Sequence, residues 1–150
     1  MQETKNQAVL DKLYELVQTC EDSVKEYQNA AKHLKEGELS TIFYRLSQQR
    51  ALFREELKSC IRDLGGSDQP DTSFSHTLQR IWIEFKSGLN GNDTDKIINT
   101  CEKIERGAVQ RYEDALKADP PEYIKEIISK QHTMIKGTFT QLEEFKRNSG

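Results

Sequence analysis

Apolar residues recur along most of this chain at alternating steps of three and four, the spacing that places them on one face of an α-helix. The first such row contains Leu10, Leu13, Val17, Cys20, Val24, Tyr27, Ala31 and Leu34. Gly37 follows the row, and a glycine commonly stands just after the end of a helix. The pattern predicts a long helix over about residues 4–35.

Three further rows predict three further long helices. The second helix, over about residues 38–64, carries the row Leu39, Ile42, Leu46, Gln49, Phe53, Glu56, Cys60 and Leu64. The third, which ends near Lys117, carries the row Ile98, Cys101, Glu105, Ala108, Tyr112 and Ala115. The fourth follows the turn Asp119-Pro120-Pro121, ends near Lys146, and carries the row Ile124, Ile128, Gln131, Ile135, Thr138, Leu142 and Phe145.

A shorter apolar row predicts one more helix, over about residues 74–89, between two polar, turn-forming segments. The long helices form two tight hairpins, and this short helix joins the second long helix to the third. We therefore predict an all-α, ferritin-like four-helix bundle with a short helical crossover. At 150 residues, the chain is expected to form a single domain over residues 1–150.

The two predicted hairpins share a short internal repeat. Residues 24–30 and 109–115 both follow the pattern Val-x-x-Tyr-x-x-Ala. Residues 46–50 and 128–132 both carry an aliphatic residue, a serine, and then a glutamine followed by a basic residue. The matches occur in the same order in each half, which indicates two related hairpins.

The overall composition excludes several classes of protein. The net charge is −3, so the charge balance gives no reason to expect nucleic acid as a partner. No segment is apolar enough to cross a membrane, and the polar N-terminus lacks the apolar run of a secretory signal. Cys20, Cys60 and Cys101 lie far apart and in apolar rows, so we expect reduced, buried thiols. A cytoplasmic protein is therefore expected.

An ordered set of residues along the chain resembles one known family. Its members are Gln49-Arg50, Glu56, Gly65-Gly66, Trp82, Glu105-Arg106-Gly107, Tyr112 and Ala115-Leu116. The set resembles the bacterial, ferritin-like four-helix-bundle proteins known as domain of unknown function 2383. The resemblance implies a ferritin-like bundle and no established activity. This chain departs from the family pattern at Thr138, where members often carry a histidine.

Polar residues on the apolar faces raise the question of a metal site. Ferritin-like bundles commonly bind two metal ions through glutamates and Glu-x-x-His motifs, but none of His33, His76 and His132 has a glutamate three residues before it. The polar residues predicted to form a layer in the core are Tyr27, Gln49, Glu56, Glu105, Tyr112 and Gln131. The candidate metal ligands are Glu21, Glu56, Glu105 and Gln131, with iron or manganese as the ion.

Three functional interpretations follow from these residues. The first is a non-catalytic structural or interaction protein with an inert polar layer, for which no catalytic residues are assigned. Leftover apolar residues favour a homodimer in that case: Val9, Phe43, Ile97 and Phe139. The alternative is a di-metal carboxylate protein that binds or stores iron or manganese, or an oxidoreductase of that class. The third is a small-molecule binder that uses a cavity at the polar layer.

Overall fold

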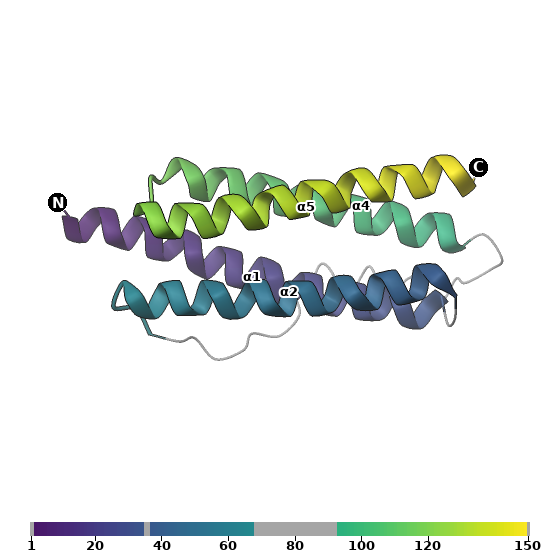
Figure 1. The fold of residues 1–150 in the computed structure, drawn as a ribbon, viewed down its shortest axis with the longest axis horizontal. Coiled ribbons are helices and arrows are strands. Elements are labelled where there is room, and N and C mark those ends of the chain that lie inside the picture. Colours follow the sequence, from purple (N-terminus) through teal and green to yellow (C-terminus); the bar gives the residue numbers. More distant parts are fainter. Residues whose placement is uncertain (1, 35–36, 68–92, 150) are drawn as a thin grey trace.

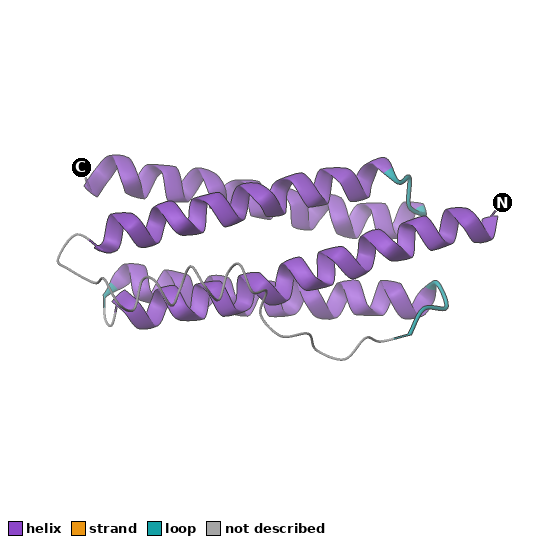
Figure 2. Ribbon diagram, turned by 180° about the vertical axis from the view of Figure 1, so that it is seen from behind, coloured by secondary structure: helices purple, strands orange, loops and turns teal. Residues whose placement is uncertain are grey.

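The computed structural model describes residues 2–34, 37–67 and 93–149, and all four long helices lie within them. The helices are α1 (Gln2–Leu34), α2 (Glu38–Asp63), α4 (Asp93–Lys117) and α5 (Glu122–Ser149). Figure 1 and Figure 2 show them as one elongated bundle, so the predicted all-α four-helix architecture is confirmed. The predicted short helix over residues 74–89, with His76 and Trp82, lies outside the described residues.

The bundle consists of two antiparallel hairpins, α1–α2 and α4–α5. Each helix packs against two neighbours: α1 lies beside α2 and α4, and α5 lies beside α4 and α2. The pairs α1–α5 and α2–α4 are therefore diagonal. The end of α2 and the start of α4 lie at opposite ends of the bundle, so α2 and α4 run in the same direction (Figure 1).

The ends of the helices are fixed by local backbone chemistry. At the end of α2, Gly65 adopts a φ of 82°, and the amide of Gly66 donates to the carbonyl of Ile61 over 2.9 Å. This satisfies a carbonyl that the helix end would otherwise leave unpaired. The last helix continues to Ser149, three residues past the predicted end.

The core consists of two apolar clusters, one toward each end of the bundle. The larger cluster includes Leu13, Leu16, Leu57, Ile61, Tyr112, Ile124 and Ile128. The other includes Tyr27, Ala30, Phe43, Leu46, Ile97, Ile98, Cys101 and Leu142. Buried polar side chains, among them Ser23, Arg50 and Glu105, accompany these clusters in the interior. The described helices contain no stretch long and apolar enough to span a bilayer.

The buried face of α2 differs from the predicted row by one residue. Phe43, Arg50 and Leu57, spaced seven residues apart, are all fully buried, whereas Gln49 is half-buried and Glu56 is exposed. A step of one residue turns a helix by about 100°, which moves Gln49 and Glu56 from the predicted core to its edge. The prediction of Glu56 as a core residue was therefore wrong, and Arg50 lies in the core instead.

We expect two glycine-to-alanine substitutions to have opposite effects on stability. Gly65 has a positive φ, and no atom lies near the place that an added methyl group would take, so Gly65→Ala should destabilise through backbone strain alone, by about 1 kcal/mol. Gly137 lies inside α5 with the same free space, so Gly137→Ala should stabilise by about 0.5–1 kcal/mol. Urea unfolding measures both, and equal effects would contradict the assigned helix end.

Candidate functional site

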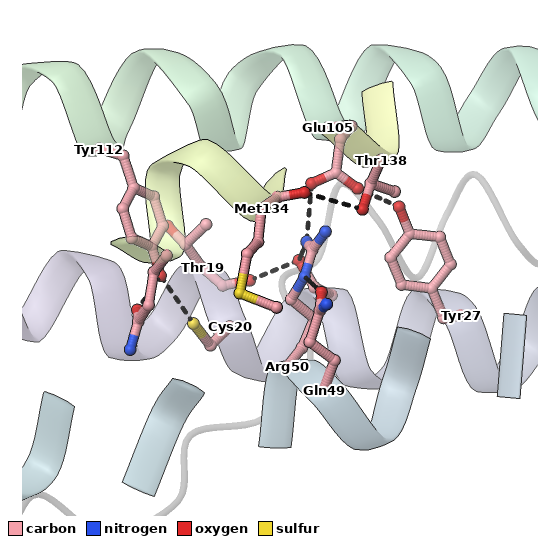
Figure 3. A network of polar contacts seen from close by, with 11 residues as sticks. Thr19, Cys20, Tyr27, Gln49, Arg50, Glu105, Tyr112, Met134 and Thr138 are labelled. Atoms are coloured by element: carbon pink, nitrogen blue, oxygen red, sulfur yellow. Dashed lines mark hydrogen bonds and ion pairs between the residues drawn. The ribbon is translucent and has the colours of Figure 1, made fainter. Parts of the chain in front are cut away.

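A buried ion pair crosses the centre of the bundle between diagonal helices. Nη1 of Arg50 on α2 donates to Oε1 of Glu105 on α4 over 2.7 Å, and the two side chains are 1% and 0% exposed. The hydroxyl of Tyr27 on α1 donates to the other oxygen of Glu105. Figure 3 shows Arg50 and Tyr27 approaching the same carboxylate from different helices. Three of the four helices therefore meet at Glu105.

The surroundings of Arg50 keep the guanidinium charged in spite of its burial. Nε donates to Oε1 of Gln49 over 3.1 Å, and the guanidinium lies 5.5 Å from the ring centre of Tyr27. Desolvation is the largest influence and lowers the pKa of Arg50, but the charge of Glu105, the hydrogen bond to it and the neighbouring Tyr27 and Cys20 together outweigh desolvation and leave the pKa above its ordinary value. Burial and the same carboxylate raise the pKa of Tyr27, so its hydroxyl remains a hydrogen-bond donor.

A second polar centre joins all four helices. The hydroxyl of Tyr112 on α4 donates to Oε1 of Gln131 on α5 over 2.7 Å. The same hydroxyl lies 3.3 Å from Sγ of Cys20 on α1 (Figure 3). Nε2 of Gln131 donates to two acceptors on α2, the carbonyl of Phe53 over 3.3 Å and Oε1 of Glu56 over 3.1 Å. The amide of Gln131 thus bridges α5 and α2.

The two centres are related by the internal repeat. Cys20 stands seven residues before Tyr27, and Glu105 stands seven residues before Tyr112. In the fold each tyrosine reaches across the α1–α4 contact to the other member of this set, Tyr27 to Glu105 and Tyr112 to Cys20. The repeat thus places equivalent contacts on the two sides of the bundle, and only one of them carries charge.

Glu26 is a buried carboxyl group that the apolar pattern did not predict. It is 0% exposed, and neither of its oxygens has a hydrogen-bond partner of normal geometry among the described residues, although the Cys101 thiol interacts with it. Desolvation and the negative charge of Glu105 raise its pKa well above the ordinary range. Glu26 therefore holds a proton under conditions in which an exposed glutamate is ionised.

The predicted metal ligands are divided between different surroundings. Glu105 binds a guanidinium and a phenol, whereas Gln131 binds Glu56 at the edge of the bundle. Glu21 is buried on α1. Within residues 2–34, 37–67 and 93–149, no group of three or more His, Cys, Asp or Glu side chains could hold a metal ion. A cation beside Glu105 would also be repelled by Arg50, so these residues do not fit a di-metal centre.

The predicted buried thiols are confirmed. Cys20, Cys60 and Cys101 are all free and buried. Burial raises the pKa of Cys20 and of Cys60 to about 11 and raises the pKa of Cys101 as well. A thiol with such a pKa is almost entirely protonated near neutral pH and is a poor nucleophile. The cysteines therefore serve as packing residues.

Of the polar core layer predicted from sequence, four members are buried and form two hydrogen-bonded pairs, Tyr27 with Glu105 and Tyr112 with Gln131. Sequence reasoning missed Arg50 and Glu26. The heptad of Phe43, Arg50 and Leu57 could have revealed the first, because two large apolar residues flank the arginine on one face. Glu26 offers no comparable pattern.

A double-mutant cycle tests how strongly Arg50 and Glu105 depend on each other. Arg50→Met and Glu105→Gln should each cost about 3–5 kcal/mol, because each leaves a buried charge without its partner. The double variant, which buries no charge, should cost less than either single variant. Urea unfolding measures all four proteins. The exposed pair Lys5–Asp119 is the control, and breaking it should cost about 0–1 kcal/mol. Additive costs at Arg50 and Glu105 would contradict the coupling.

The raised pKa of Glu26 predicts a pH-dependent difference between the protein and its Glu26→Gln variant. The unfolded chain loses this proton above its ordinary pKa of about 4.3, whereas the folded protein keeps it. The group's contribution to stability is thus complete below about pH 4.3 and is lost, by at most about 1.4 kcal/mol per pH unit, as the pH rises toward the folded-state pKa.

Glu26→Gln removes this loss, so its stability relative to the unchanged protein should improve as the pH rises above about 4.3 and until it passes the folded-state pKa of Glu26. Unfolding in urea across this range measures the difference. Glu15→Gln, at an exposed position on the same helix, should show no such trend. A Glu26→Gln difference that is constant with pH would show that Glu26 is ionised in the folded protein.

Comparison with known proteins places the chain in a family without assigning it an activity. A family model matches residues 8–118, which include most of α1, all of α2 and α4, and both residues of the central ion pair. No curated protein matches the chain. The match covers well over half of the sequence, and the resemblance drawn from its ordered residues is thereby confirmed. The chain belongs to the family described as domain of unknown function DUF2383.

Proposed function

We propose that this protein is a non-catalytic helical bundle that acts through interactions, and that its buried polar layer fixes how the four helices pair. The observation that carries the proposal is the Arg50–Glu105 ion pair. In this pair the charged guanidinium of Arg50 binds the carboxylate of Glu105, which would otherwise be the best candidate for a metal ligand. A buried pair of this kind acts mainly by penalising every arrangement of the helices that separates its members.

The chemistry of the other buried groups supports the same proposal. Tyr27 and Tyr112 have raised pKa values through burial, and the three thiols are protonated. General acid–base catalysis works best with groups whose pKa lies near the working pH, and the raised pKa values of these tyrosines and thiols lie further from it than their ordinary values. The pKa of Glu26 is also raised, but its side chain is fully buried. The tyrosines of the polar layer therefore keep their protons near neutral pH and serve as fixed hydrogen-bonding partners.

Self-association as a homodimer and a cytoplasmic location remain parts of the proposal. Three of the apolar residues that favoured a dimer in the sequence, Val9, Phe43 and Ile97, are buried within the protomer and cannot form the dimer contact. The proposed dimer contact therefore relies on exposed aromatic side chains, Tyr44 on α2 and Tyr123 on α5. Sedimentation velocity distinguishes a dimer from a monomer directly.

Metal loading separates this proposal from the di-metal alternative. Protein purified without chelators or a histidine tag is incubated with Fe²⁺ in the absence of oxygen, or with Mn²⁺, and its metal content is measured after gel filtration. We expect the unchanged protein and its Glu105→Gln variant to retain equally little metal. Near-stoichiometric iron or manganese that is lost on Glu105→Gln or Glu56→Gln would overturn the proposal and establish a working metal centre.

A further inference from the structure

A cavity opens on the side of the bundle where α2 and α5 face each other. Its volume is about 720 Å³, within the range of about 300–1,000 Å³ that is common for small-molecule sites. Residues from two turns of each helix line it, between positions 49 and 56 on α2 and between 126 and 134 on α5. Of the four neighbouring helix pairs, α2 and α5 approach each other least closely, which leaves the cavity open to solvent.

The walls of the cavity are apolar. They are formed by Leu52 and Phe53 on α2 and by Ile127 and Met134 on α5. Leu52 is 68% exposed and Met134 is 41% exposed, and these are two of the four large apolar side chains that the described surface leaves most open. A ligand with an apolar body would remove this surface from water.

The rim and floor of the cavity are acidic and hydrogen-bonding. Three carboxylates, those of Glu55, Glu56 and Glu126, stand against a single cation, Lys130. Arg54 partly neutralises Glu55 over 3.0 Å, whereas Glu126 has no ion-pair partner in the described parts of the chain. Lys58 also lies 4.0 Å from Glu55, so the negative charge left at the cavity is that of Glu56 and Glu126 against Lys130, and this favours a cationic ligand over an anionic one.

Gln131 fixes the floor and holds one of the acidic groups in position. It is 1% exposed, it lines the cavity, and its amide donates to Glu56. The same amide is held by Tyr112 and by the backbone of Phe53, so it has little freedom to move. Glu56 is thus presented at the cavity in a fixed position, which lowers the entropic cost of binding a ligand there.

We propose that this cavity binds a small organic cation with an apolar tail, whose ammonium group pairs with Glu56 and Glu126 and whose tail packs on Leu52 and Met134. This site is separate from the Arg50–Glu105 pair and stands whether or not the buried layer is structural. A second copy of the chain fits less well, because a twofold contact of this surface with itself would bring carboxylates against carboxylates.

Titration of ¹⁵N-labelled protein with hexylammonium tests the proposal. Amide resonances of residues lining the cavity on both α2 and α5 should shift and saturate. Hexanoate, which has the same chain length and the opposite charge, and methylammonium, which lacks the tail, should each bind at least about tenfold more weakly. Absence of saturable shifts at the cavity with hexylammonium, or equal binding of hexanoate, would overturn the proposal.

Matched variants assign any binding to the cavity. Glu126→Lys should weaken hexylammonium about fivefold, as expected when one partly exposed attraction becomes a repulsion, and Glu143→Lys, the same change elsewhere on α5, should leave it unchanged. Leu52→Ser should also weaken binding, and Tyr44→Ser on the same helix should not. Equal effects within either pair would overturn the proposal.

A dimer of the unchanged protein that dissociates on Leu52→Ser would also overturn it, because a second copy would then occupy the cavity.

Discussion

The burial of one charge pair constrains the whole bundle. Arg50 and Glu105 lie on helices that are diagonal to each other, so their contact can form only if all four helices hold their positions around them. Removing both charges from water costs several kcal/mol each, and their attraction offsets this only when the remaining hydrogen bonds are made. Tyr27 and Gln49 supply two of those bonds. The apolar clusters provide most of the driving force for folding, and in the role proposed above the pair selects one arrangement among those the clusters would tolerate.

Helical periodicity was sufficient to predict the four helices, because each amphipathic row is long. Turn residues marked the ends of α1, α2 and α4, whereas no such residue marks the end of α5, which was predicted three residues too early. Periodicity was also sufficient to find Glu105, Tyr112 and Gln131, which interrupt apolar rows at positions that proved to be buried. It failed on α2, where a stripe of mixed polar and apolar residues left two neighbouring faces nearly equivalent. Packing of α2 against α1 and α5 decided between them, and that choice placed Arg50 inside and Glu56 outside. Glu26 could not be found because its burial depends on the same tertiary contacts.

The four sides of the bundle are closed to different degrees. α1 lies close to α2, and the buried residues of α1 include the small side chains Thr19, Ser23 and Ala30. Where α2 faces α5, the facing positions include Leu52, Phe53 and Met134, and the helices stand further apart. Gln131 is the hydrogen-bonding bridge on that open side. The surface that is available to other molecules thus lies beside the polar groups that organise the interior.

The two related hairpins carry different side chains at equivalent buried positions, and this difference affects which hairpins can pair with each other. If two α1–α2 hairpins paired with each other, the repeat would place Cys20 where Glu105 now stands, and each Arg50 would be buried without a carboxylate. If two α4–α5 hairpins paired, His132 would replace Arg50, and each Glu105 would lack its guanidinium. Only the mixed assembly neutralises both charges. The two hairpins are therefore complementary in charge. Pairing of α1–α2 from one chain with α4–α5 from another would preserve the ion pair, whereas pairing of two like hairpins would not.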